Sequence, residues 1–281
     1  MKEHEGQFEV QSMCEALNVS KTGYYAWKKR PESALAKRRR QIVEKIRTVH
    51  QQSRRTYGSP RVTAELKATG VSVCENTVAR YMREEGIESK IKRRFCVKTT
   101  DANHDHPLAP NRLERDFQAD APNRKWCCDI TYVPTDEGWL YLAAVIDLCS
   151  RRVVGWAMAD HLRAELCLDA LSMAIEQRRP AAGLLHHSDR GVQYACDAYR
   201  SFLERHGIEA SMSRSGNCYD NAVMESFFGT FKTELVYHEH YRTRTQARTS
   251  IFDYIEVFYN RQRRHSAIGY QSPEQFEAGL N

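Results

Sequence analysis

The stretch KWCCDITYVPTDEGWLYLAAVIDLCSRRVVGWAMA, residues 125–159, decides the fold class of this chain. It contains three runs rich in β-branched and aromatic residues, separated by the turn sequences PTDEG and LCS. Runs of this composition between short turns are typical of consecutive β-strands. We therefore predict a three-stranded antiparallel meander over these residues.

Helical and strand patterns alternate after the meander. Residues 163–179, 196–207 and 220–237 predict helices, and residues 183–189 and 208–213 predict short strands. The resulting order, βββαβαβα, indicates an α/β fold in which helices flank a mixed five-stranded sheet. A further helical stretch follows near the C-terminal end.

Length and composition indicate the class of protein. The 281 residues are enough for about two domains, and 41% of them are hydrophobic. No run approaches the roughly 18 apolar residues of a membrane span, and the first residues, MKEHEGQFEV, lack a signal-peptide pattern. The nine cysteines are scattered, and none forms a CxxC pair. We expect a cytoplasmic protein with reduced thiols and no membrane partner.

Charge is distributed unevenly along the chain. Residues 1–100 hold 22 Lys and Arg against 11 Glu, whereas the remainder holds 20 basic and 25 acidic residues. Residues 8–30 have the outline of a helix-turn-helix with Ser20 as an N-cap, and a second basic outline follows, with Asn76 capping its last helix. This favours nucleic-acid binding by the first third over the alternative of solvated helical surfaces.

These patterns divide the chain into five segments. Residues 98–124 carry three prolines and no clear period, which is typical of a linker. The segments are a helix-turn-helix-like segment (1–33), a second basic helix-turn-helix-like domain (34–97), the linker (98–124), the α/β core (125–240) and a C-terminal helical segment (241–281).

Three acidic residues stand at unusual positions in the core. Asp129 lies inside the first strand, Asp189 ends the strand LLHHSD, and Glu225 lies on the helix DNAVMESFFGTFKTELVY. The apolar stripe of that helix comprises Met224, Phe228, Phe231 and Leu235. Lys232 follows Glu225 by two helical turns and so shares its face.

A charged group in or beside a core is costly unless it is paired, protonated or bound to a metal. Three carboxylates from separate elements can share that cost by converging on Mg²⁺, which prefers such oxygens. Two ions roughly 4 Å apart would activate a nucleophile and stabilise the leaving oxygen of a phosphodiester. The pattern thus indicates a nuclease-like site.

Each acid also has a structural interpretation when it is taken alone. The first could cap a bulge or pair with an arginine, the second could form a turn, and the third could be a half-exposed helix residue. His186 and His187 fit packed strand histidines better than metal ligands, and Asp147 fits a turn-former before LCSRR.

Several motifs resemble a known family. WCCDITYV, GWLYLAAVIDLCSRRVVGW, HHSDRGVQYA and SGNCYDNAVMESFFGTFKTEL resemble the integrase-like catalytic core of bacterial insertion-sequence transposases. The nearest likeness is to the second-frame product, OrfB, of the family with two overlapping frames. RRTYGSPRVTAEL, NTVARYMREEGI and YNRQRRHSAIGYQSPEQF resemble its upstream helix-turn-helix part and its C-terminal segment, and 35 residues separate Asp189 from Glu225, as in its D-D-35-E signature.

The resemblance implies a ribonuclease-H-like core and a chemistry. Asp129, Asp189 and Glu225 match the acidic triad that would hold two Mg²⁺ ions, for which Mn²⁺ would substitute, and Lys232 matches the basic residue that follows the family's glutamate. The implied activity is metal-dependent DNA strand cleavage and strand transfer at the ends of an insertion sequence. Water would first expose a 3′-hydroxyl, which would then attack a second phosphodiester.

The resemblance also implies partners. These are double-stranded DNA, as terminal inverted repeats and as target, further copies of the chain on that DNA, and the first-frame product as a separate chain or frameshift fusion. A nucleoid-associated bacterial protein is expected. The side chains expected to contact DNA are Lys21, Lys28, Lys37, Arg38, Arg39, Arg40, Arg61, Arg80, Arg83 and Lys232. Arg261, Arg263 and Arg264 of the tail either contact phosphates or belong to a solvated helix end.

Two alternative functions stay open. One is a sequence-specific DNA-binding regulator with an inactive core, against which the intact acids and Lys232 argue. The other is a structure-selective nuclease, which the two helix-turn-helix outlines disfavour.

Overall fold

The computed structural model describes residues 1–90, 107–214 and 218–280. Its sheet has five strands in the order β3-β2-β1-β4-β5. The strands are β1 (Lys125–Thr135), β2 (Gly138–Asp147), β3 (Val153–Ala159), β4 (Leu185–Ser188) and β5 (Glu209–Met212). The first three pair antiparallel, and β4 and β5 extend the sheet in parallel. The predicted meander and the mixed sheet are confirmed.

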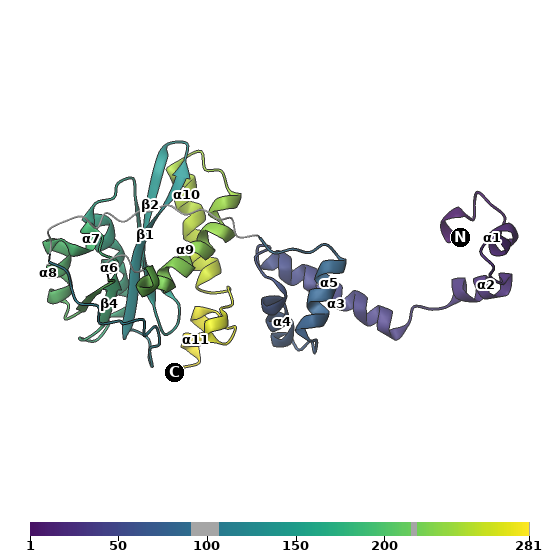
Figure 1. The fold of residues 1–281 in the computed structure, drawn as a ribbon, viewed down its shortest axis with the longest axis horizontal. Coiled ribbons are helices and arrows are strands. Elements are labelled where there is room, and N and C mark those ends of the chain that lie inside the picture. Colours follow the sequence, from purple (N-terminus) through teal and green to yellow (C-terminus); the bar gives the residue numbers. More distant parts are fainter. Residues whose placement is uncertain (91–106, 215–217, 281) are drawn as a thin grey trace.

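Helices cover both faces of the sheet (Figure 1). One face carries α6 (Ala164–Arg178), α7 (Val192–Ala195) and α8 (Asp197–Arg205), and the other carries α9 (Ala222–Glu234) and α10 (Arg244–Phe252). Helix α6 packs so closely on β3 that a Cβ atom added at Gly155 would lie 2.2 Å from the carbonyl oxygen of Ala170. Only glycine permits this approach.

The two adjacent cysteines of β1 point to opposite faces, as neighbours on a strand must. Cys127 packs in the cluster that contains α9, and Cys128 packs in the cluster that contains α6. Every cysteine whose side chain the structure describes is a free thiol.

The C-terminal part folds back onto the core. Helix α10 continues into a π-helical segment (Asp253–Tyr259), whose Tyr254, Ile255 and Phe258 are buried. Helix α11 (Pro273–Ala278) follows, and Ser272 caps it in a capping box with Gln275. Short 3₁₀ turns lie at Lys2–His4, Cys218–Asn221, Val236–His238 and Ser266–Ile268.

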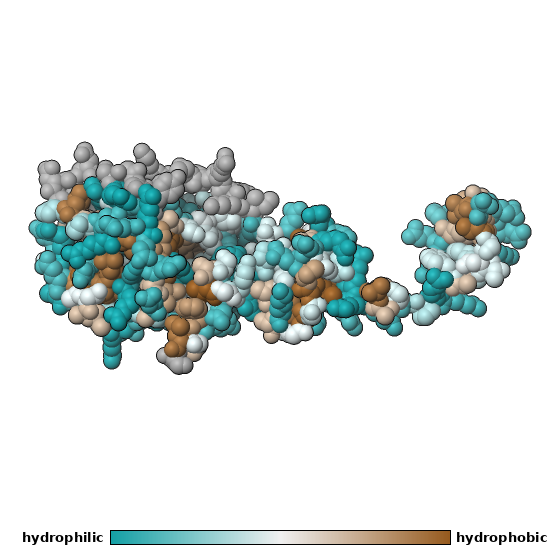
Figure 2. Space-filling view, turned by 60° about the horizontal axis from the view of Figure 1, so that its bottom comes forward, coloured by the Kyte–Doolittle hydropathy of each residue, from teal (hydrophilic) through white to brown (hydrophobic). Residues whose placement is uncertain are grey.

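The N-terminal third is helical, as expected. Helices α1 (Val10–Ala16) and α2 (Lys21–Lys29) lie at the end of the molecule farthest from the sheet (Figure 1). Ser20 caps α2 by accepting a hydrogen bond from Gly23 N at 3.0 Å, which confirms that N-cap. The surface in Figure 2 is mainly hydrophilic, and its apolar patches include one on this terminal unit.

Helices α3 (Ala34–Gln52), α4 (Ser59–Ala68) and α5 (Glu75–Glu84) form the α3–α5 unit. Ile46, Val62 and Val78 are fully buried within it. The predicted N-cap at Asn76 is wrong, because α5 already begins at Glu75 and Cys74 holds the cap position.

The expected linker falls partly on residues 91–106, which lie outside the described residues. Its remaining part runs along the core. Leu113 is buried, and the backbone N–H groups of Arg112 and Leu113 donate to Ser211 Oγ at 2.9 and 3.2 Å. Among the helices of the described ranges, none is both long enough and apolar enough to span a bilayer.

Candidate active site

The pairing of β1 with β4 places two of the three acids side by side. The strands run parallel, with Cys127 opposite His187. Asp129 and Asp189 each follow by two residues, so they point to the same face, where Cys127 packs against α9. Neighbouring strands lie about 4.8 Å apart, which brings the two aspartates together at the carboxyl end of β4.

Short local hydrogen bonds orient both aspartates. Asp129 Oδ1 accepts from Ile130 N at 2.7 Å, and Asp189 Oδ1 accepts from Gly191 N at 2.9 Å. A Cβ atom added at Gly191 would lie 3.0 Å from that Asp189 oxygen, so glycine keeps the turn after β4 narrow.

Helix α9 places Glu225 and Lys232 near these aspartates. The predicted stripe is buried: Met224, Phe228, Phe231 and Leu235 are each less than 10% exposed. Glu225 is exposed beside this stripe, and Lys232 is half-buried. Lys232 Nζ lies 4.8 Å from the centre of the Tyr132 ring on β1, so this face of the helix lies over the strand that carries Asp129.

The electrostatics couple these groups. Burial is the main cause that raises the pKa of Asp129 well above its usual range, and the negative charges of Asp189 and, less strongly, Glu225 add to it. Lys232 acts in the opposite direction on the Asp129 carboxyl. Desolvation raises the pKa of Glu225 and lowers the pKa of Lys232. The Asp129 carboxyl therefore lies within the electrostatic influence of Asp189, Glu225 and Lys232.

The donor set fits a hard divalent cation, because it consists of carboxylates alone. Within the described residues, however, no three His, Cys, Asp or Glu side chains gather closely enough to hold a metal ion. The carboxylates lie near one another without forming a closed metal site.

Asn221 is a site residue that our sequence analysis missed. It holds the N-cap position of α9, and its side-chain Nδ2 donates to the carbonyl oxygen of Cys128 at 3.3 Å. Its Oδ1 is buried and makes no hydrogen bond with the described residues. An Asn before a helix is a capping signal, but its contact with a strand 93 residues earlier has no local signal.

Asp220, also missed, anchors the start of the same helix. It is fully buried and accepts hydrogen bonds from Arg115 Nε at 3.2 Å and from Arg214 Nε at 3.1 Å. The Arg214 bond is the largest of the causes that lower the pKa of the Asp220 carboxyl. Arg115, from the described part of the expected linker, thereby connects this segment to the start of α9.

The interpretations of the other candidate ligands are confirmed. His187 is buried between Ser211 and Ser213, with ring nitrogen to Oγ distances of 2.8 and 3.1 Å, and His186 contacts Tyr199 OH at 3.1 Å. Asp147 is fully buried and orders the turn after β2 by accepting from the N–H groups of Cys149 and Ser150, at 2.9 and 3.0 Å.

Most of the expected DNA contacts lie on exposed N-terminal surface. The exposed side chains are Lys21, Lys28, Lys37, Arg38, Arg39, Arg40, Arg80 and Arg83. Several already pair with acids: Lys28 with Glu5 at 2.5 Å, Arg39 with Glu84 at 2.9 Å, and Arg40 with Glu32 at 3.1 Å. Arg61 points inward instead, and its Nη1 lies 3.9 Å from Glu234 Oε1.

The interpretation as a solvated helix end is wrong for Arg263 and Arg264. Arg263 is 3% exposed and binds Glu234 through two hydrogen bonds of 2.7 Å. Arg264 binds Glu65 of α4 and donates to Tyr270 O at 2.6 Å. Internal carboxylates hold both guanidinium groups, whereas Arg261 is exposed.

Comparisons with known proteins identify similar families and structures. Residues 119–218 and 225–279 match two models described as "Integrase core domain", and residues 37–95 match an "HTH-like domain". The chain is 12% identical to a chain of the simian T-cell lymphotropic virus intasome in complex with PP2A regulatory subunit B56 gamma, with a TM-score of 0.46 over 82% of this chain and 73% of that one.

Sequence relatives decide the family. The chain is 43% identical over 279 residues to the transposase InsF for insertion sequence IS3A of Escherichia coli (strain K12), covering 99% of this chain and 96% of the relative. It is 45% identical over 264 residues to an uncharacterized 31 kDa protein of insertion element IS600 from Shigella sonnei, covering 94% and 97%. Identity of this extent along the whole length assigns the family. The chain therefore belongs to the IS3 family of insertion-sequence transposases, enzymes of DNA transposition.

Proposed function

We propose that Asp129, Asp189 and Glu225 are the catalytic carboxylates of DNA strand cleavage and strand transfer in this transposase. The observation that carries this proposal is the register of β1 and β4, which brings the two aspartates together beneath α9. The raised pKa of Asp129, caused by burial and by the neighbouring acids, supports it further.

Mg²⁺ ions bound by these residues, two by analogy with other phosphodiester sites and replaceable by Mn²⁺, would supply an activated nucleophile and a charge partner for the leaving oxygen. The residues have separate tasks. Asp129 provides ligand oxygens from β1 and Asp189 provides them from the turn directly after β4, and Asp129 must first lose the proton that burial favours. Glu225 completes the donor set from α9. Lys232, whose ammonium lies against the Tyr132 ring, is placed to contact a phosphate beside the reacting one.

The same proposal assigns DNA binding to the basic N-terminal third. Its exposed cations would hold the terminal inverted repeats and target DNA through phosphates. We further propose that the chain acts as a homo-oligomer on DNA, in association with the nucleoid, together with the first-frame product as a partner chain or fusion. The domain division of the sequence analysis, with a core at residues 125–240, is proposed in the same sense.

The test is a cleavage and strand-transfer assay on duplexes that carry the terminal repeats of the element, with Mg²⁺ or Mn²⁺. We expect Asp129→Asn, Asp189→Asn and Glu225→Gln each to abolish cleavage and to change the Kd for DNA by less than about twofold, since their contacts are not phosphate contacts. Glu204→Gln, which removes an exposed acid of α8, is the matched control and should cleave normally. Full activity of any one triad variant would remove that residue from the centre.

A further inference from the structure

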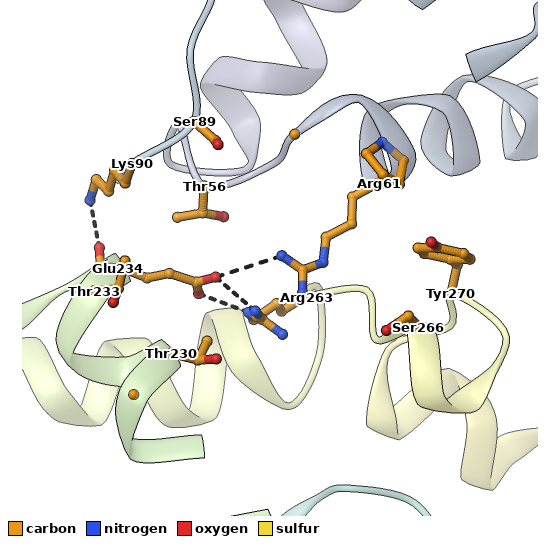
Figure 3. A pocket seen from close by; sticks show the side chains of 13 residues that line it. Thr56, Arg61, Ser89, Lys90, Thr230, Thr233, Glu234, Arg263, Ser266 and Tyr270 are labelled. Carbon is orange, nitrogen blue, oxygen red and sulfur yellow. Dashed lines mark hydrogen bonds and ion pairs between the residues drawn. The ribbon is translucent and has the colours of Figure 1, made fainter. Parts of the chain in front are cut away.

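A pocket of about 410 Å³ lies where the α3–α5 unit, helix α9 and the C-terminal segment meet. Figure 3 shows it from close by, with Arg61 and Lys90 entering from the α3–α5 unit, Glu234 from α9 and Arg263 from the C-terminal segment. Hydroxyl groups of Ser, Thr and Tyr side chains fill most of the remaining polar lining. We call it the interdomain pocket.

The lining of the interdomain pocket is strongly positive. Arg61, Lys90 and Arg263 face a single carboxylate, Glu234. A second pocket of about 290 Å³ shares Arg61 and Arg263, adds Arg151, and has no acidic residue in its lining. Together the two hollows bring four cations to one carboxylate, which favours an anionic ligand.

The carboxylate of Glu234 is already occupied by hydrogen bonds within the protein. Glu234 accepts two hydrogen bonds of 2.7 Å from Arg263, both side chains being nearly inaccessible. Arg61 lies 3.9 Å from Glu234, and within the described residues its guanidinium makes no hydrogen bond. Lys90 Nζ donates to the neutral backbone oxygen of Glu234 at 2.6 Å, and it has no ion pair with the described side chains.

Lys90 is thus a half-buried cation without an ion pair among the described side chains, and Arg61 must share Glu234 with Arg263 at the longer distance of 3.9 Å. Desolvation is the largest cause that lowers the pKa of each. Half-burying a cation without a partner is unfavourable, and an anion in the pocket would remove that cost. A phosphate diester matches the set, because guanidinium, ammonium and hydroxyl groups are its usual donors.

The pocket lies beside the proposed catalytic face of the same helix. Gly229, Thr230 and Thr233 line it from α9, one to two turns beyond Glu225. At 1.5 Å per residue, Thr233 lies about 12 Å along the helix axis from Glu225. A strand of duplex DNA advances about 3.4 Å per nucleotide, so this distance corresponds to roughly three to four nucleotides.

We propose that the interdomain pocket binds a backbone phosphate of the reacting DNA strand, a few nucleotides from the scissile phosphate. The proposal rests on the function proposed above, since it takes Glu225 as the catalytic end of α9. According to this proposal, the bound DNA strand passes over the place where the α3–α5 unit contacts the core.

The test measures DNA affinity in EDTA, where no cleavage occurs, so that it is independent of the catalytic proposal. A fluorescent duplex is titrated with full-length protein carrying Lys90→Gln or Arg61→Gln, at salt concentrations from 0.05 to about 0.3 M. Loss of one phosphate contact should weaken binding by about eightfold at 0.1 M salt and lower the slope of log K against log salt by about 0.9. Arg61→Lys should restore part of the affinity, because it restores the charge.

The matched control is Arg205→Gln, which removes one exposed cation from α8, on the opposite face of the sheet. It should leave the salt slope unchanged. A circular-dichroism melt of each variant separates loss of contact from loss of fold. A slope in correctly folded Lys90→Gln equal to that of the unsubstituted protein overturns the proposal.

A second arm separates DNA from free phosphate. Inorganic phosphate is added at constant ionic strength, and the Tm is compared with that in chloride. If phosphate raises the Tm only when Lys90 is present while the DNA affinity of Lys90→Gln is normal, the ligand is a free phosphate and the DNA assignment is wrong. If triad variants fail to cleave and Lys90→Gln binds weakly, both proposals stand.

Discussion

Asn221 joins helix α9 to strand β1 through a hydrogen bond from its Nδ2 to the carbonyl oxygen of Cys128, 3.3 Å away. Cys128 directly precedes Asp129, and Asn221 stands four residues before Glu225. The bond therefore sets where the glutamate lies relative to the aspartate.

Asn221→Ala should impair cleavage more than stability. We expect a loss of about 1 kcal/mol in the free energy of unfolding, the usual net value of one hydrogen bond. The cleavage rate should fall by more than tenfold, because small misplacements of reacting groups are costly, while the Kd for DNA stays constant. Rates in single-turnover assays, with Asn76→Ala as an exposed control, check this. A normal rate would show that the packed stripe of α9 suffices to position Glu225.

Asp129→Asn should stabilise the protein at neutral pH in EDTA while it abolishes cleavage. The folded protein holds the Asp129 proton more tightly than the unfolded chain does, because burial raises this pKa. The stabilising effect of that proton is complete in acid and is lost as pH rises through the raised pKa. An amide avoids this loss, and a gain of about 1 kcal/mol would raise the Tm by about 2–4 °C. An Asp129→Asn protein that melts below the unsubstituted protein at pH 8 would contradict this.

Mg²⁺ should raise the Tm of the unsubstituted protein but not that of Asp129→Asn. At a concentration ten times its Kd, a ligand that binds only the folded state stabilises by about 1.4 kcal/mol. Melts with increasing MgCl₂, compared with NaCl at equal ionic strength, check the metal site without any activity measurement. Equal shifts in both proteins would place the binding elsewhere.

Glu234→Gln should be strongly destabilising. It leaves Arg263, which is 3% exposed, without its partner, and breaking such a buried pair costs about 3–5 kcal/mol. Urea unfolding measures the loss. Glu274→Gln is the control, since its pair with Arg261 is exposed and 3.9 Å long, and such a pair contributes at most about 1 kcal/mol. Similar losses for both variants would mean that Arg263 finds another partner.

Acid should destabilise the fold through the strand histidines. Burial lowers the pKa of His187 to about 4 and that of His186 to about 3, whereas an unfolded histidine has a value of 6.5. The stability that depends on their neutral form is complete above pH 6.5 and is lost as pH falls toward 4. His187→Gln removes one of these titrating groups, so the free energy of unfolding should decline less steeply between pH 6.5 and 4. Urea unfolding at several pH values measures this dependence, and His206→Gln, at an exposed position, is the control. The same pH dependence of the free energy of unfolding in both variants would refute the prediction.

Local patterns in the sequence predicted the elements well. Runs of β-branched and aromatic residues between turn sequences predicted β1, β2 and β3, and the stripe of Met224, Phe228 and Phe231 predicted the buried face of α9. The three acids drew notice because carboxylates are rare in such positions. These signals depend only on residues that are close together in the sequence, so they do not depend on how distant segments pack.

Local sequence patterns did not predict contacts between segments that are distant in the chain. Arg263 belongs to a basic run that is typical of a solvated helix end, yet it is buried against Glu234, 29 residues earlier. Arg61 was expected on an exposed DNA-binding surface, but it is half-buried and lines the interdomain pocket. Charge alone does not tell a surface arginine from a buried one, because the difference lies in a partner elsewhere in the chain.

The sequence by itself determined the succession of strands and helices along the chain and singled out the three acids, because both depend on local periodicity or on residue type. Only the tertiary structure decided that Asp129 and Asp189 are neighbours, that Asn221 ties α9 to β1, and that Glu234 holds three parts of the chain together. The physical reason is that register and burial arise from packing between segments far apart in the chain, which no local pattern encodes.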